Sequence, residues 1–311
     1  MTNKFIPVLL LLLLACIWGS SFILMKRGME SLDGHTIFSD FQVAALRMCI
    51  ASVVLLPITI YNYRKLTNWK DVISLATVGT CGNFIPAFLF TYAETELSSG
   101  YAGMLNSFTP IFTLLIGGLI FQQKLNANQF IGVLIAFSGM VFLMYAGQQL
   151  DNAGTWKHIG AILLATILYG VSLNTIKYRL SHLRSMEITS LSFGILLIPG
   201  LIAVFYGDVL NIFMGNTYAG EGLLFISILS IVGTALALIV FNRVIALTST
   251  IFASSVTYLI PIVAVIIGYF FGESINMLQI LAMLVVLVGV FIANYWQMVF
   301  KKVQTSSNSD N

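Results

Sequence analysis

The stretch Trp18-Gly19-Ser20-Ser21-Phe22, followed by Lys26, returns later in the chain as Tyr169-Gly170-Val171-Ser172-Leu173, followed by Lys177. Each position of the second copy lies 151 residues after its counterpart. The same offset relates Ser98, Ala102, Pro110 and Gly117 to Ser249, Ala253, Pro261 and Gly268, and an offset of 150 relates Gln129 and Gly139 to Gln279 and Gly289. An offset held so constantly predicts two related halves, which we place at residues 1–150 and 151–302.

The composition excludes most classes of soluble protein. Hydrophobic residues make up 58% of the 311 residues and charged residues only 9%, whereas a soluble domain carries roughly 25% charge. This argues against a soluble enzyme, a nucleic-acid binder and a disordered chain, and the net charge of +3 is too small to indicate a DNA partner. The three cysteines lie in apolar runs and indicate no disulfide framework. The remaining class is an all-α integral membrane protein whose solvent is the lipid bilayer.

Ten apolar segments are long enough to cross a membrane, since one crossing needs about 20 residues. They leave only short loops, and the polar residues 303–311 are predicted to form a disordered cytoplasmic tail. The ten segments are Phe5–Met25, Phe38–Ile60, Val72–Tyr92, Gly100–Phe121, Gln129–Gly147, Lys157–Tyr178, Ile188–Tyr206, Gly222–Arg243, Thr250–Phe271 and Met277–Met298.

The cations predict the orientation of these segments. With the N-terminus in the cytoplasm, three cations lie outside, namely Lys26, Arg27 and Lys157. Eleven lie inside, namely Lys4, Arg64, Lys65, Lys70, Lys124, Lys177, Arg179, Arg184, Arg243, Lys301 and Lys302. Because cytoplasmic loops carry an excess of Lys and Arg, both termini are predicted to be cytoplasmic, in the inner (plasma) membrane of a cell.

Five spans in each half have a topological consequence. Because five is odd, the second half must enter the membrane from the opposite side, which makes the halves inverted repeats. Inverted repeats are typical of secondary transporters, in which a central site opens alternately to each side. A duplication kept only for packing, or a channel, are the alternatives. The sequence does not indicate the oligomeric state, because no G-x-x-x-G dimerisation face stands out.

These residues resemble the EamA-type branch of the drug/metabolite transporter superfamily. The resemblance rests on the ten spans, on Trp18 to Phe22, on Arg47 in the second span, and on the stretch from Ser98 to Phe112 with its echo from Thr248 to Pro261. In that family, both the stretch and its repeat in the second half usually end in a Gly-Glu pair. Here the second copy keeps this pattern with Gly272-Glu273, whereas the first copy departs from it with Phe121-Gln122-Gln123.

The resemblance implies a transporter of small metabolites. Known members export amino acids and related compounds, and relatives carry nucleotide sugars or triose phosphates. We therefore expect an amino acid exporter, with a nucleotide-sugar or organic-anion exchanger as the alternative. The resemblance also implies that spans one, three, four, six, eight and nine line the cavity and that spans five and ten are peripheral braces.

Polar and aromatic side chains near mid-membrane are the candidate substrate contacts, because such groups usually face the bundle interior. Ordinary helix–helix hydrogen bonding and packing are the alternative explanation for each of them. The candidates are Trp18, Ser21, Asn83, Tyr101, Asn106, Tyr169, Asn174, Thr257 and Tyr258.

Four further residues are candidates for gating or coupling. Pro110 and Pro261 lie at matching positions, and a proline frees the carbonyl four residues earlier, here that of Asn106 or Thr257. These carbonyls either face a wet cavity or are filled by a neighbouring side chain. Arg47 needs an acid, a carbonyl or a substrate anion, and Glu94 is a candidate coupling acid.

We expect Glu273 to have a structural role at the start of the last span. No enzyme activity is predicted, because the three histidines lie at loops and no nucleophile–base pair lies at membrane depth. Metal-ligand spacing, a P-loop and G-x-G-x-x-G are also absent from the sequence, so no metal or cofactor is expected. Transport would then be driven by a gradient.

Overall fold

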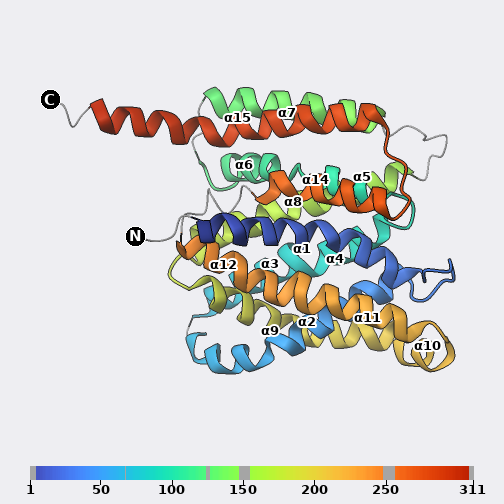
Figure 1. Cartoon of the computed structure of the whole chain (residues 1–311). Coiled ribbons are helices and arrows are strands. Elements are labelled where there is room, and N and C mark those ends of the chain that lie inside the picture. Colours follow the sequence, from blue (N-terminus) through green and yellow to red (C-terminus); the bar gives the residue numbers. More distant parts are fainter. Residues whose placement is uncertain (1–4, 67, 124–126, 147–154, 248–255, 308–311) are drawn as a thin grey trace.

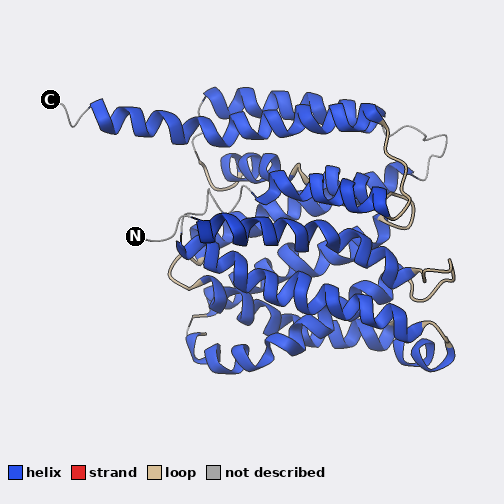
Figure 2. Ribbon diagram, viewed as in Figure 1, coloured by secondary structure: helices blue, strands red, loops and turns tan. Residues whose placement is uncertain are grey.

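The structure is a computed structural model that describes residues 5–66, 68–123, 127–146, 155–247 and 256–307. Every regular element in these ranges is helical (Figure 2), and one isolated β-bridge joins Glu30 to Thr36. The all-α prediction is therefore confirmed for the described part of the chain.

The helices form a bundle in which successive elements run back and forth along one direction (Figure 1). Their bounds are α1 Phe5–Met29, α2 Asp40–Asn62, η1 Tyr63–Lys65, α3 Trp69–Gly79, η2 Thr80–Phe84, α4 Ile85–Ala93, α5 Ser99–Asn106, α6 Thr109–Leu119, α7 Ala127–Ala146, α8 Thr155–Arg179, α9 Ser185–Tyr206, α10 Val209–Gly215, α11 Ala219–Ser230, η3 Ile231–Leu236, α12 Ala237–Leu247, α14 Val256–Phe270 and α15 Met277–Ser307.

Eight helical stretches of the described residues are long and apolar enough to cross a membrane. Two shorter apolar helices, Leu259–Phe270 and Met277–Ile292, follow them, so the predicted count of ten is not confirmed. The short helix α10 was not expected from the sequence. α15 continues to Ser307, so the described part of the predicted disordered tail is helical.

Helix starts coincide with residues that cap them. Ser39 Oγ accepts a hydrogen bond from the Gln42 amide at 3.2 Å, and Gln42 Oε1 accepts one from the Ser39 amide at 2.9 Å. This capping box begins α2, because it satisfies two amides that have no partner within the helix. Ser98 Oγ accepts from the Tyr101 amide at 3.2 Å and begins α5 in the same way.

Two segments of π-helix interrupt the third and eighth spans. η2 joins α3 to α4, and η3 joins α11 to α12, so each lies inside an otherwise continuous helix. The two segments begin at Thr80 and Ile231, which are 151 residues apart. The repeat in the sequence is thus also a repeat of a rare backbone conformation, one that is frequent at functional sites.

Helix contacts between the halves repeat at the same offset. A Cβ on Gly19 of α1 would lie 2.6 Å from Val263 of α14, and one on Gly170 of α8 would lie 3.0 Å from Phe112 of α6. Both members of the second pair are 151 residues from their counterparts. Each half therefore sends one helix into close contact with the other half in an equivalent way.

α7 and α15 pack along one another at the edge of the bundle, as Figure 1 shows. A Cβ on Gly139 would lie 2.7 Å from the backbone nitrogen of Val286, and one on Gly289 would meet the backbone nitrogen of Ala136. These contacts are again related by an offset of 150. The glycines let the two helix backbones approach closely, as small residues do in membranes.

We expect Gly289→Val to lower the free energy of unfolding by about 1–3 kcal/mol, because the added side chain meets backbone atoms that have nowhere to move. Thermal unfolding of the purified protein in detergent measures the effect. Gly160→Val is the matched control, since nothing lies within 4 Å of the Cβ position there. Equal shifts for both variants would show that α7 and α15 do not pack as described.

The bundle has two ends that matter for function. The start of α1, the end of α6 and the end of α15 lie at one end, on the left of Figure 1. The connection from α14 to α15 lies at the other end, on the right. We name them the Lys177 end and the Lys26 end, after the lysine in the last turn of α8 and the one in the last turn of α1.

Candidate functional site

The two π segments each pack against the first helix of the opposite half. A Cβ on Gly82 of η2 would meet Ser172 Oγ of α8, and a Cβ on Gly233 of η3 would lie 3.0 Å from Ser21 Oγ of α1. Gly82 and Gly233 are 151 residues apart, as are Ser21 and Ser172. The centre of the bundle is therefore built twice from a glycine in a π turn and a facing serine.

The indole of Trp18 is held against η3. Its Nε1 donates a hydrogen bond to the Gly233 carbonyl at 3.0 Å, and its ring lies 5.3 Å from that of Phe241. Tyr169, the counterpart of Trp18, stacks on Phe90 with ring centroids 6.0 Å apart. Both aromatic residues thus lie in the interior between the halves, and both are only partly buried.

The side chain of Arg47, on α2, contacts the π segment η3, which also binds the indole of Trp18. Its Nε donates to Thr234 Oγ1 at 3.4 Å, and its Nη1 lies 3.5 Å from Met25 Sδ. None of the ion pairs found among the described residues includes Arg47. A membrane-embedded cation normally pairs with an acid or a carbonyl, so two weak partners leave most of the guanidinium donors for another group.

Glu94 follows the third span directly and is 2% exposed. Neither carboxylate oxygen has a hydrogen-bond partner among the residues that the structure describes. Burial raises the pKa of this carboxyl group well above its usual value, and Glu273 acts in the same direction, whereas Lys26 and Arg47 lower it. Glu94 is thus a buried acid that accepts a proton readily.

The other polar candidates divide into two groups. Asn83, in η2, makes no hydrogen bond through its side chain within the described residues, and it is partly exposed. In contrast, Asn174 donates to the carbonyls of Thr113 and Gly170 at 2.9 and 2.8 Å. Tyr101 is 5% exposed and donates to the Leu143 carbonyl at 3.2 Å. These two side chains tie helices together rather than facing an open site.

The two prolines lie in different places in their helices. Pro110 lies in the first turn of α6, where a break separates α5 from α6. The Asn106 carbonyl accepts a hydrogen bond from Thr109 Oγ1 at 2.9 Å, so a neighbouring side chain fills that gap. Pro261 lies inside α14. Thr257 has a polar or electrostatic partner of its own, while the Tyr258 side chain lies outside the described part.

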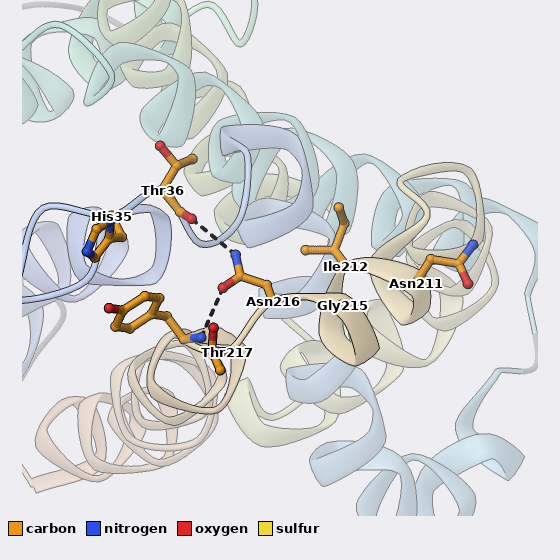
Figure 3. A pocket seen from close by; sticks show the side chains of 8 residues that line it. His35, Thr36, Asn211, Ile212, Gly215, Asn216 and Thr217 are labelled. Atoms are coloured by element: carbon orange, nitrogen blue, oxygen red, sulfur yellow. Dashed lines mark hydrogen bonds between the residues drawn. The ribbon is translucent and has the colours of Figure 1, made fainter.

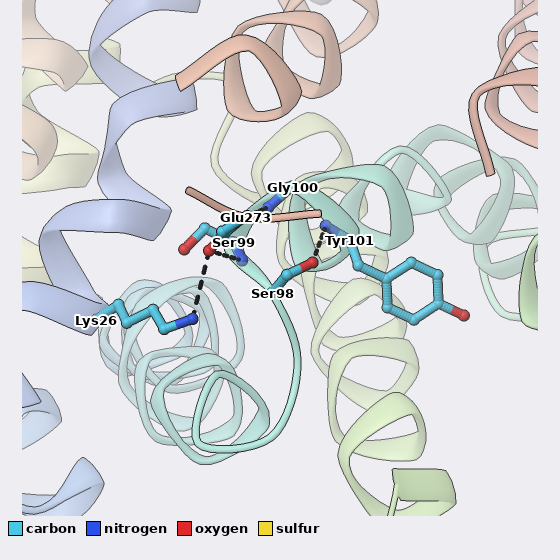
Figure 4. Close-up of polar contacts among 6 residues, drawn as sticks. All are labelled: Lys26, Ser98, Ser99, Gly100, Tyr101 and Glu273. Atoms are coloured by element: carbon cyan, nitrogen blue, oxygen red, sulfur yellow. Dashed lines mark hydrogen bonds and ion pairs between the residues drawn. The ribbon is translucent and has the colours of Figure 1, made fainter. Parts of the chain in front are cut away.

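The sequence led us to expect Glu273 to act at the start of the last span, but its contacts lie elsewhere. Its carboxylate accepts hydrogen bonds from the amides of Ser99 and Gly100 at 2.8 and 3.0 Å, and it lies 3.4 Å from Lys26 Nζ (Figure 4). It therefore caps α5 and joins the α14–α15 connection to α1. The prediction was wrong because the capped helix is near in space but far away in sequence.

A pocket of about 530 Å³ opens at the surface between the α1–α2 loop and the α10–α11 region (Figure 3). His35, which stacks on Tyr218 at 4.7 Å, and Asn216, which donates to the Thr36 carbonyl at 3.1 Å, shape its wall. None of the predicted substrate residues lines it. Among the described residues there is also no group of three or more potential metal ligands.

Comparison with known proteins shows to which family the chain belongs. The model of the EamA-like transporter family matches the chain twice, over residues 5–145 and 156–295. The chain belongs to the EamA-like transporter family. The two matches coincide with the two halves deduced from the repeat, and this EamA-family chain is therefore a membrane transporter built from two repeats.

Relatives of this EamA-family chain are transporters as well. It is 26% identical over 295 residues to the uncharacterized inner membrane transporter YedA of Escherichia coli (strain K12), covering 91% of this chain and 89% of YedA. It is 27% identical over 184 residues to the inner membrane transporter YhbE of the same strain, covering 57% and 56%. A solved crystal structure with 13% sequence identity aligns with a TM-score of 0.58, covering 94% and 99%, and shares the fold.

Sequence reasoning missed Gly82, Gly233 and Thr234, although a signal for the two glycines was present. The two glycines are 151 residues apart, which is the offset that relates the first span to the sixth. Comparing the third span with the eighth would have found them. Nothing in the sequence, however, indicates that a π turn forms there, because its contacts come from distant helices.

Proposed function

We propose that this EamA-family chain exports amino acids or closely related compounds by alternating access between two inverted five-helix halves. Its termini would lie in the cytoplasm, so the Lys26 end would face the extracytoplasmic side. Contacts that repeat across the halves support the mechanism, because two equivalent interfaces allow two equivalent states. The site would lie between the halves, around the π segments.

The observation that carries the proposal is Arg47, an embedded cation whose hydrogen-bond partners among the described residues are a threonine hydroxyl and a thioether. A guanidinium binds a carboxylate through two parallel hydrogen bonds. Glu94 lies within electrostatic range of Arg47, and its carboxylate has no hydrogen-bond partner in the described part of the chain. One cation and one acid in the same region suit a zwitterion, which carries one carboxylate and one ammonium group.

The organic-anion alternative fits these charges less well. A nucleotide sugar brings two phosphate charges, and Arg47 is the one cation placed within the interior of a span in the described part of the chain. Such a substrate also lacks the ammonium group that would displace the proton of Glu94. Trp18, Tyr169 and Asn83 complete the proposed site, together with Thr234, whereas Tyr101 and Asn174 are assigned to packing.

Flux into and out of proteoliposomes, measured with a panel of labelled amino acids and one nucleotide sugar, tests this proposal. We expect flux of an amino acid and none of the nucleotide sugar. Asn83→Ala should reduce the flux about tenfold, since one hydrogen bond is worth about 1 kcal/mol and a little more when partly buried. Asn211→Ala, an exposed asparagine in α10, is the matched control. Flux of the nucleotide sugar alone would contradict the amino acid proposal.

Glu94 is proposed to couple transport to protons. Without substrate, its buried carboxyl group holds a proton, and an arriving ammonium group would displace that proton toward the opposite compartment. We expect Glu94→Gln to transport substrate down its own gradient but to lose acceleration by an imposed pH gradient. Internal pH-dye fluorescence during flux measures the coupling. An unchanged response to the pH gradient in Glu94→Gln would assign the proton to another group.

A further inference from the structure

One polar contact cluster lies at each end of the bundle, and each cluster joins the two halves. At the Lys26 end, Lys26 and the amides of Ser99 and Gly100 converge on Glu273 (Figure 4); we name this cluster the Lys26 latch. At the other end, Gln123 Oε1 accepts from Lys177 Nζ at 3.5 Å and from the Tyr178 hydroxyl at 3.1 Å; we name this the Lys177 latch.

The two latches are copies of one another. Lys26 and Lys177 are 151 residues apart, and Gln123 and Glu273 are 150 apart. The backbone amide of Gln123 donates to the Gly117 carbonyl at 2.9 Å, and the backbone amide of Glu273 donates to the Gly268 carbonyl at 2.9 Å.

A residue with positive φ precedes each latch residue, although the turn that ends at Gln123 is one residue longer than the turn that ends at Glu273. Gln122 and Gly272 have φ values of 53° and 83°, so both take the left-handed conformation that normally favours glycine. The residue after this left-handed position is thus a carboxylate at the Lys26 end and a side-chain amide at the Lys177 end.

This one difference makes the latches unequal. The Glu273 carboxylate is largely buried, with 7% of its side chain exposed, and its three partners include a cation and two helix amides. The Gln123 amide is neutral, and Lys177 beside it is exposed. Hydrogen bonds between charged groups are roughly twice as strong as neutral ones, so the Lys26 latch holds more tightly.

We infer that the two latches are the gates of this transporter, and that the Gln123 amide weakens the Lys177 gate so that the resting protein stays closed at the Lys26 end. This inference rests on the proposed alternating access, in which the two ends open in turn and the weaker latch opens more readily. Because the Lys26 end is predicted to be extracytoplasmic, the bias would let an exporter load from the cytoplasm.

Hydrogen–deuterium exchange of the full chain in nanodiscs, without substrate, tests the inference. Gln123→Glu gives the Lys177 latch the charge that Glu273 supplies at the other end. We expect slower exchange in residues 170–180 and, at the opposite end, exchange about fivefold faster in residues 98–106, since a charged hydrogen bond replaces a neutral one. The response at the distant end is the deciding result, because a merely local contact would not produce it.

Three further variants make the test specific. Gln122→Glu adds the same charge one residue away and should leave residues 98–106 unchanged. Lys177→Met leaves the Tyr178 hydroxyl on Gln123 but weakens the Lys177 latch, so it should slow exchange in residues 98–106. Gln123→Glu combined with Glu273→Gln should give the largest acceleration there. If both Gln123→Glu and Lys177→Met leave residues 98–106 unchanged, the latches are not coupled gates. Such a result alongside working flux in proteoliposomes would refute this inference alone, whereas absent flux in the unmodified protein would refute the proposed function.

Discussion

Arg47→Met should reduce substrate flux in proteoliposomes by about a hundredfold or more, because losing a desolvated charge contact costs about 2–5 kcal/mol. The fold should survive. Arg47 makes no ion pair in the described part of the chain, and its hydrogen bond to Thr234 is long at 3.4 Å. Removing an uncompensated cation from the membrane interior is itself favourable.

Flux and thermal stability must therefore be measured together for Arg47→Met. A substrate anchor predicts lost flux with an unchanged or higher melting temperature. Arg47→Lys should retain part of the flux, because lysine keeps the charge but loses the two-pronged geometry of the guanidinium. A lower melting temperature in Arg47→Met, with flux reduced only in proportion to the folded protein, would assign Arg47 to structure.

The second large effect concerns the glycines in the π segments. Gly82→Ala and Gly233→Ala should each reduce flux by more than about tenfold, because the added methyl group meets Ser172 or Ser21 and overpacking costs about 1–3 kcal/mol. Rates in proteoliposomes, corrected for the amount of folded protein, measure the effect. Gly160→Ala is the control at an open helical position.

Partner substitutions test whether those contacts explain the loss. Ser172→Gly should restore flux to Gly82→Ala, and Ser21→Gly should restore it to Gly233→Ala, whereas the crossed combinations should not. Contacting residues couple in this way, and distant ones usually add independently. Equal rescue by both serine substitutions would show that the glycines act through general stability instead.

The sequence predicted the repeat because related halves keep residue types at a constant offset, as Gly139 and Gly289 do. It could not predict the π turns, since Gly82 and Gly233 take that form where a serine of another helix approaches. Among polar residues at membrane depth, Asn83 and Asn174 look alike in sequence. Only the structure shows that Asn174 is occupied by two carbonyls.

At the Lys26 end, the sequence likewise did not predict which groups contact the charged residue Glu273. Glu273 was identified as a helix cap, but its partners are Ser99 and Gly100, more than 170 residues earlier in the chain. From the local sequence, the helix that starts nearest along the chain is the expected partner. The fold instead places the start of α5 beside Glu273. The departure at Gln123 was visible in the sequence, yet its meaning depends on Lys177 lying beside it.

Counterflow in proteoliposomes tests whether one site between the two halves opens alternately to each side of the membrane. Vesicles are loaded with an unlabelled amino acid substrate, and entry of the labelled substrate is then followed. The account predicts that internal substrate accelerates labelled entry, that the rate saturates, and that Arg47→Met abolishes both. Labelled entry that rises linearly with concentration and is indifferent to internal substrate would indicate a channel and contradict the account.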